Sequence, residues 1–127
     1  MSITTVTHIN LRGNAREALE FYQRVFGGDL VAIPHAEDPG QVLWGQVTSP
    51  AGFHVMAFDV PPSQPWSRGE NPFFVSVRGT DTEEVSGYWK RLAEGSTVVV
   101  DLAPSQWSPL YGMVTDRFGV TWVLDVA

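Results

Sequence analysis

Two short segments of this sequence place a histidine beside another polar or flexible side chain at the spacing of a β-strand. His8 and Asn10 lie two residues apart in the first segment, and His54 and Met56 lie two residues apart in the second. Side chains at positions i and i+2 share one face of a strand. Because imidazole titrates near neutral pH, such a face could orient a ligand or take part in proton transfer. The same side chains could instead be hydrogen-bonded polar groups without a role in chemistry.

Tryptophan is frequent in this chain, with five copies in 127 residues. Trp44, Trp66 and Trp107 fall on a predicted strand and two predicted loops, where a large flat side chain can line a pocket or an interface between protein copies. Trp122 falls on a predicted strand, either in the core or in the wall of a cleft. The residues that we expect to contact a ligand are His8, Asn10, Trp44, His54, Met56, Trp107 and Trp122.

The composition narrows the possible partners. The chain carries 14 acidic and 8 basic residues, for a net charge of −6, which argues against nucleic acid or an anionic membrane because both need a basic face. An acidic protein could bind a cationic ligand, although acidic surfaces also simply favour solubility. The absence of cysteine excludes thiol catalysis, disulfides and thiolate metal sites. With no signal-like segment and no apolar run long enough to cross a bilayer, we expect a cytoplasmic protein.

The elements that must position these side chains occur twice. Residues 8–28 read as a strand, a tight turn, a helix and a glycine stop, and residues 77–95 repeat that order at an offset of 66. The later strand pair repeats as well, because residues 45–52 and 112–119 share the pattern G-x-V-T-x-x-x-G at an offset of 67. Each half therefore reads as strand, helix and three strands, that is, βαβββ.

Both copies carry the signals of a helix start. Asn14 and Thr80 are the expected N-caps, and Glu17 and Glu83, three residues further on, complete a capping box in each copy. Apolar residues at helical spacing then predict two buried stripes. The stripes are Ala15, Ala18, Leu19, Tyr22 and Phe26 in the first helix and Val85, Tyr88, Trp89 and Leu92 in the second.

The repeat also sets the organisation of the chain. We predict an α+β protein of one domain, residues 1–127, built from module 1–60, a proline-rich linker 61–71 and module 72–127. Residues 29–35 should form an edge strand, because Pro34 cannot donate a hydrogen bond to a neighbouring strand.

Two acidic residues end corresponding strands. We expect Asp59 to pair with Arg12 and Asp125 to pair with Arg78.

Two motifs resemble a known family. The segment GNAREALEFYQRVFGG after the first strand and the segment YGMVTDRFGVTWVLDV at the end resemble the PhnB-like branch of the vicinal oxygen chelate superfamily, which includes glyoxalase I, extradiol dioxygenases and bleomycin-resistance proteins. The resemblance covers essentially the whole chain. It implies two βαβββ modules that form a curved mixed sheet, as in the glyoxalase/bleomycin resistance/dihydroxybiphenyl dioxygenase fold. It also implies a cleft in that sheet and a homodimer.

Metal-dependent members that resemble glyoxalase I take two ligands from each module. His8 matches the first position, but its counterpart in the second copy is Phe74, which cannot coordinate a metal. The remaining two positions fall on Met56 and Val123 or on their immediate neighbours, none of which is a carboxylate or an imidazole. His54 is the one nearby residue that could add a ligand. We therefore expect no obligatory metal and no other cofactor.

The resemblance leaves the activity open. Some members of the branch carry the label 3-demethylubiquinone 3-methyltransferase, but this chain has no G-x-G-x-x-G loop and is short for a doubly wound methyltransferase. We expect a protein that binds a small organic molecule in an aromatic-rich cleft, with no catalytic residue assigned. The alternatives are a metal-dependent lyase, isomerase or dioxygenase of glyoxalase type, and sequestration of a cationic drug of bleomycin type.

Overall fold

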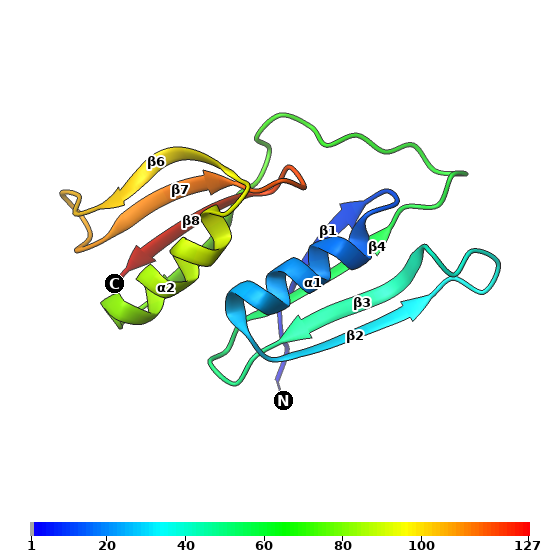
Figure 1. The fold of residues 1–127 in the computed structure, drawn as a ribbon, viewed down its shortest axis with the longest axis horizontal. Helices are drawn as coiled ribbons and strands as arrows, with labels where there is room; N and C mark the ends of the chain where they lie inside the picture. The colour runs from blue at the N-terminus through cyan, green and yellow to red at the C-terminus, as the bar shows by residue number, and fades with distance from the viewer. Residues whose placement is uncertain (1) are drawn as a thin grey trace. The chain divides into compact units, whose positions relative to one another are not determined.

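The computed structural model describes residues 2–127, which form two units that each combine one helix with one four-stranded sheet (Figure 1). The units are Met1–Arg68 and Gly69–Ala127, so the boundary lies inside the predicted linker 61–71. In the part of the chain that the structure describes, no helix is both long and apolar enough to span a membrane.

The first unit has the predicted element order. Its elements are β1 (Thr7–Leu11), α1 (Ala15–Phe26), β2 (Asp29–Pro34), β3 (Val42–Thr48) and β4 (His54–Asp59). The strands lie in the order β1-β4-β3-β2, with β1 parallel to β4 and the other pairs antiparallel. Because β2 ends at Pro34 and lies at the edge of the sheet, the prediction of an edge strand is confirmed.

The helix α1 covers one face of this sheet (Figure 1). All five residues of the predicted stripe are buried, together with Phe21 and Val25. The contact is close where Leu19 lies over β3, since a Cβ added to Gly45 would come within 2.5 Å of Leu19 Cδ1. The opposite face of the sheet is left uncovered by α1, and this determines which strand residues could meet a ligand.

The second unit repeats the first. Its elements are β5 (Val75–Gly79), α2 (Thr82–Ala93), β6 (Thr97–Ala103), β7 (Tyr111–Thr115) and β8 (Thr121–Val126). Its strand order, β5-β8-β7-β6, has the same pattern of one parallel pair and two antiparallel pairs. The prediction of two βαβββ modules in an α+β fold is therefore confirmed.

The stripe of α2 is less buried than the sequence predicts. Val85 and Leu92 are buried, and the Trp89 ring packs so closely on β7 that a Cβ added to Gly112 would lie 2.8 Å from it. Tyr88 instead is only half-buried, and its hydroxyl donates a hydrogen bond to Glu84 Oε2 at 2.6 Å. Desolvation, together with this bond, raises the pKa of Tyr88 to about 12.

Asn14 is the N-cap residue of α1, as predicted, but neither predicted capping box forms among residues 2–127. The side chain of Asn14 makes no capping bond, and the start of α1 is instead satisfied by Asp59, whose Oδ1 accepts from the backbone N–H of Gly13 at 2.7 Å and of Ala15 at 3.1 Å. At α2 the N-cap is Asp81, which accepts from the N–H of Glu83 at 3.0 Å. Asp59 is far away in the sequence, so no local pattern could reveal it.

One of the two predicted ion pairs is confirmed. Arg78 Nε donates to Asp125 Oδ1 at 3.1 Å. Asp59, however, uses its second oxygen to accept from the N–H of Val42 at 2.8 Å. Arg12 donates to the backbone carbonyls of Pro61 and Gln64.

Replacing Asp59 with alanine should destabilise the protein strongly. Asp59 is 5% exposed and accepts three backbone hydrogen bonds, and each buried donor left unpaired costs about 1–3 kcal/mol. We expect Asp59→Ala to lower the free energy of unfolding in urea by about 3 kcal/mol or more. Asn14→Ala is the matched control, because Asn14 Oδ1 is buried without a partner among residues 2–127. That variant should change the free energy of unfolding by about 0.5 kcal/mol or less. A large loss of stability in Asn14→Ala would show that the Asn14 side chain caps α1 after all.

Candidate functional site

The face of the first sheet turned away from α1 gathers most of the predicted ligand residues. Ile9, Val47, Val55 and Ala57 are buried on the helix side, so the residues that alternate with them lie on the other, open face. The strand register arranges this open face in three rows across the sheet. The rows are His54, Thr48 and Asp29; His8, Met56, Gln46 and Val31; and Asn10, Phe58, Trp44 and Ile33.

The histidines of this open face are each held by an amide. His54 Nε2 lies 2.9 Å from Gln46 Oε1, and His8 Nδ1 lies 3.1 Å from Asn10 Oδ1. When the nitrogen facing the amide oxygen carries the proton, the other ring nitrogen becomes a hydrogen-bond acceptor for a ligand. The His8 ring also meets the Phe58 ring edge-on at 5.1 Å between centroids. The face therefore offers acceptors and donors beside aromatic surface.

Five of the seven predicted ligand residues lie together on this face. They are His8, Asn10, Trp44, His54 and Met56. The sequence reasoning missed Gln46 and Phe58. The signal that could have found them is the same two-residue spacing, since Gln46 follows Trp44 by two and Phe58 follows Met56 by two.

The remaining two predicted residues lie in the second unit and differ from each other in exposure. Trp122 is 0% exposed, on the side of its sheet that packs with Val114 and Leu124 in the core. Its indole N–H donates to Asp116 Oδ2 at 2.9 Å. Trp107 is 68% exposed and meets the Tyr111 ring edge-on at 5.2 Å between centroids. Trp107 can therefore reach a ligand, whereas Trp122 is a core residue.

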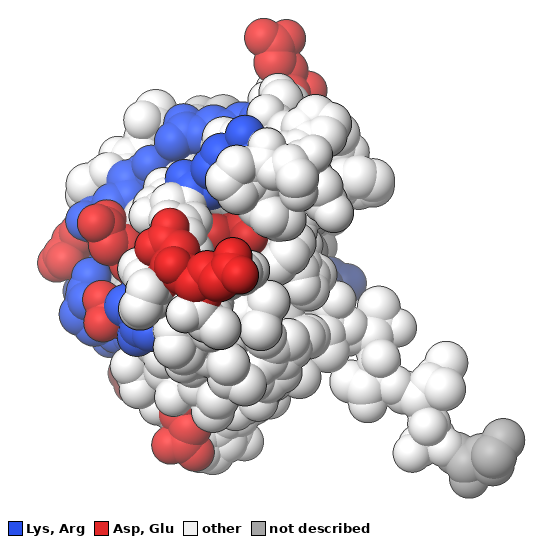
Figure 2. Space-filling view, turned by 90° about the vertical axis from the view of Figure 1, so that its right-hand side faces the viewer, with Lys and Arg blue, Asp and Glu red and all other residues white. Residues whose placement is uncertain are grey.

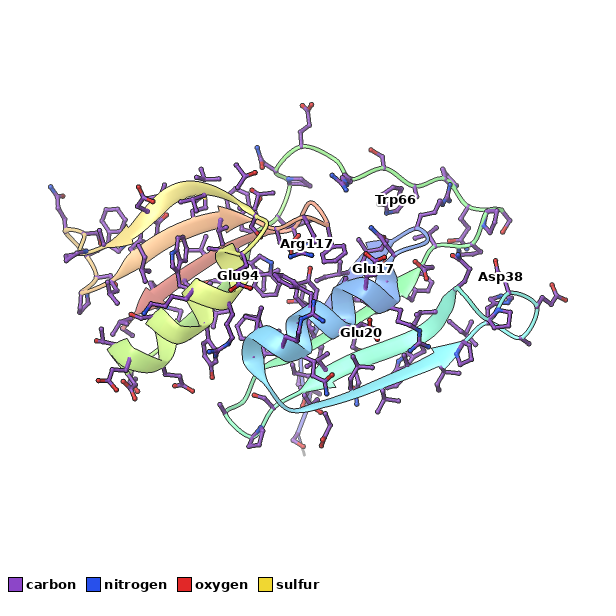
Figure 3. All side chains as sticks on the ribbon, viewed as in Figure 1. Glu17, Glu20, Asp38, Trp66, Glu94 and Arg117 are labelled. Atoms are coloured by element: carbon purple, nitrogen blue, oxygen red, sulfur yellow. The ribbon has the colours of Figure 1, made fainter. Side chains whose placement is uncertain are left out.

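The segment after β4 runs back along the edge of β1. The indole N–H of Trp66 donates to the carbonyl oxygen of Asn10 at 2.9 Å, and Trp66 is labelled in Figure 3. Arg12 holds the same segment through the carbonyls of Pro61 and Gln64. Trp66 was expected to line a pocket or an interface, and the structure places it against a strand edge beside the open face.

Most acidic residues of the first unit lie away from this open face. Glu17 and Glu20 project from α1 and Asp38 lies on the β2–β3 loop (Figure 3). Asp29, at the edge strand, is the one carboxylate in the three rows. Figure 2 shows acidic and basic side chains close to one another on the face in view, with broad uncharged surface beside them.

The residues present do not fit the metal site that the family resemblance would imply. Within residues 2–127, no three His, Cys, Asp or Glu side chains are grouped closely enough to hold a metal ion. On the open face of the first sheet, His8 and His54 lie in different rows and each faces an amide rather than a carboxylate. Neither amide is a strong ligand for a transition metal. The side chains of this face therefore do not make up a metal site.

The fold and the repeated modules define the class of protein. The chain belongs to the Glyoxalase/Bleomycin resistance protein/Dioxygenase superfamily, whose family model matches residues 5–124. This confirms the family predicted from the two motifs.

Several known proteins are similar along almost their whole length. The crystal structure of PA1353 from Pseudomonas aeruginosa has a TM-score of 0.85 at 29% identity, with 98% of each chain covered. A PhnB protein from Bacillus cereus, whose name proposes a 3-demethylubiquinone-9 3-methyltransferase, has a TM-score of 0.77 at 22% identity, covering 98% of this chain and 100% of that one. The protein YjdN of Escherichia coli K12 is 24% identical, over 94% of this chain and 92% of its own length. The PhnB protein shares the fold of this chain.

Trp122→Phe should affect stability rather than any surface site. The substitution removes buried ring volume and leaves Asp116 Oδ2 without its indole donor. We expect the free energy of unfolding in urea to fall by about 2–4 kcal/mol. Trp107→Phe, at an exposed site, should change it by about 0.5 kcal/mol or less. Equal losses for the two variants would contradict the assignment of Trp122 to the core.

Proposed function

We propose that this protein binds a small, flat, uncharged organic molecule on the open face of the first sheet, as a PhnB-like member of its superfamily, without a metal. The observation that carries the proposal is the pairing of His54 with Gln46 at 2.9 Å and of His8 with Asn10 at 3.1 Å, beside half-buried aromatic and exposed aliphatic side chains. Polar groups at fixed positions on a mostly apolar surface are typical of ligand sites.

The ligand would be recognised by hydrogen bonds and by apolar contact. The imidazole and amide groups can donate to a carbonyl or accept from a hydroxyl. Met56, in the centre of the face, can adapt to the shape of a ring because its side chain is flexible and polarizable. Trp44 and Phe58 supply flat surface in the next row. Such a molecule is expected to carry one or two polar substituents on an aromatic or conjugated body.

Both enzymatic alternatives have little support from these side chains. A glyoxalase-type lyase, isomerase or dioxygenase would need a set of metal ligands, and the open face offers two imidazoles held by amides. A methyltransferase, as the name of the Bacillus cereus relative proposes, would need a cofactor cradle, and the sequence has no G-x-G-x-x-G loop. Binding without an assigned reaction is therefore the proposal.

Sequestration of a cationic drug is also disfavoured. A cation would be held by carboxylates or by aromatic faces. The three rows of the open face contain one carboxylate, Asp29, at the edge strand. The other acidic residues of the first unit lie outside these rows, so the net charge of −6 is better explained as favouring solubility.

Methionine methyl groups give a direct test of ligand binding. With ¹³C-methyl methionine, the Met56 signal reports the open face of the first sheet and the Met113 signal reports the second sheet. We expect titration with 1-naphthamide to shift the Met56 signal, and Gln46→Ala to weaken binding by about two- to tenfold through the loss of one hydrogen-bonded group. Glu20→Ala, on the exposed side of α1, is the control and should leave binding unchanged.

The same titration separates the alternatives. EDTA should leave the Met56 shift unchanged, whereas a shift that requires an added divalent ion would support the metal-dependent reading. A naphthylmethylammonium ion that bound more tightly than 1-naphthamide at Met56 would support sequestration of a cation and contradict the proposal.

We further propose that the protein is a homodimer, as the family resemblance implies. Val98, Val99 and Val100 on the edge strand β6 are 41%, 54% and 41% exposed, and an apolar edge strand is a favourable site for pairing with a second copy. Light scattering should give about twice the chain mass of 14.0 kDa, and Val99→Lys should give the monomer mass. Thr97→Lys, at the start of the same strand, is the control; a dimer unchanged by Val99→Lys would place the interface elsewhere. The expected cytoplasmic location rests on the sequence and stays a prediction.

A further inference from the structure

The sheet of the second unit carries an arginine that is only partly used by the protein. Arg78 on β5 donates through Nε to Asp125 on β8 at 3.1 Å. Within residues 2–127, its two terminal Nη atoms have no hydrogen-bond partner. The side chain of Arg78 is 60% exposed, whereas that of Asp125 is 10% exposed. The guanidinium is thus held by one nitrogen, and its terminal N–H groups are left for a ligand.

An aromatic pair lies beside this arginine. Tyr111 on β7 is opposite Asp125, which is opposite Arg78, so the three residues form one row across three adjacent strands. Neighbouring strands are about 4.8 Å apart, which places the Tyr111 backbone about 10 Å from that of Arg78. Trp107 extends the aromatic surface, because its ring meets the Tyr111 ring at 5.2 Å.

The exposed Trp107 lies on a loop that is held by hydrogen bonds of the buried residue next to it. The next residue, Ser108, is 5% exposed. Its Oγ lies 2.6 Å from the carbonyl oxygen of Val126 and also within hydrogen-bond distance of the Leu110 carbonyl. Its own carbonyl accepts from the N–H of Ser105 at 2.9 Å. An aromatic side chain that is exposed but held in position can bind a flat molecule at little cost in ordering.

Apolar side chains form the next row of this face. Val123 lies between Ser76 and Met113 in the register of the three strands. The side chains of Val123 and Met113 are both partly exposed. The face therefore presents an apolar surface bordered on one side by a cation and by two aromatic rings.

We infer that this face of the second sheet binds a planar aromatic carboxylate. The carboxylate would accept hydrogen bonds from the terminal nitrogens of Arg78, whose planar fork matches a carboxylate. The ring would lie over Met113 and Val123, against Tyr111 and Trp107. The inference goes beyond the proposed function and does not depend on it, because all of these residues lie in the other unit.

The competing reading is an ion pair that only stabilises the sheet. Under that reading, loss of either partner weakens the protein in the same way. A ligand site makes a different prediction, because Asp125 competes with the ligand for the arginine. Removing the charge of Asp125 should strengthen the binding of a carboxylate. Removing the charge of Arg78 should make the carboxylate bind no more tightly than a neutral compound of the same shape.

The experiment uses the methyl signal of Met113 in the full chain. We expect 1-naphthoate to shift this signal and to bind on the order of tenfold more tightly than the neutral 1-naphthamide. Asp125→Asn should strengthen naphthoate binding several-fold, and Arg78→Gln should make naphthoate and naphthamide equal. Lys90→Gln, which removes the same charge from the exposed side of α2, should change neither affinity. Trp107→Ala should weaken the binding of both compounds by about two- to tenfold, because the contact with the indole ring is lost.

The double variant Arg78→Gln/Asp125→Asn protects the test against unfolding, because it leaves no unpaired buried charge. Circular dichroism would confirm its fold, and it should bind the two compounds equally. The inference is overturned if wild-type protein does not prefer naphthoate, or if Arg78→Gln and Asp125→Asn change naphthoate binding in the same direction. It is also overturned if Trp107→Ala dissociates an oligomer and leaves naphthoate binding unchanged, which would make Trp107 an interface residue.

Discussion

A single buried carboxylate ties together the segments on which the first unit depends. Asp59 ends β4, and its oxygens accept hydrogen bonds from the turn before α1, from the first residue of α1 and from the first residue of β3. Buried backbone N–H groups must be paired, so this one side chain fixes where the helix begins relative to the two central strands. The helix then seals one face of the sheet. The other face, with its histidines and amides, is open as a result.

The two units share a topology but present different chemistry. In the first, Asp59 lies opposite Leu11 and holds the helix start, whereas in the second that task falls to Asp81 in the turn itself. Asp125 alternates with the core residues Leu124 and Val126, so it lies on the open face of its sheet, where it meets Arg78. One face offers imidazole–amide pairs, and the other offers a guanidinium beside tyrosine and tryptophan. Duplication has kept the framework while the side chains that face outward have diverged.

The sequence predicts the framework better than the details of its contacts. The repeat at offsets of 66 and 67, the stripe of α1 and the edge position of β2 follow from spacing, turn residues and Pro34, because they depend on local periodicity. The hydrogen bonds that cap the helix do not follow from local periodicity. Asn14 has a residue type typical of a cap, but the backbone N–H groups at the start of α1 donate to Asp59, which is distant in the sequence. Trp122 illustrates the same limit. Its position on a strand is predictable, but only the register of β7 and β8 shows that it points into the core.

The candidate sites are also predictable in part: the sequence shows which residues share a strand face, but not which side chains they contact. Alternation along the strands is enough to group His8, Asn10, His54 and Met56, but not to reveal that each histidine faces an amide. The ion pair of Arg78 with Asp125 could be predicted from the sequence, whereas the position of the loop that carries Trp107 depends on hydrogen bonds of its buried neighbour Ser108.

The parallel pairing of β1 with β4 and of β5 with β8 has a consequence for the order of folding. The antiparallel pairs join segments that are near in sequence, while each parallel pair joins the first strand of a unit to its last. Closing a long loop costs more entropy than closing a short one, so we expect the three-stranded meanders to assemble early and the first strands to dock late. His8, Asn10 and Arg78 all belong to those late strands. A partly folded or newly synthesised chain would therefore contain most of its sheets before it acquired either of the proposed sites, and a ligand at either site would select the fully assembled molecule.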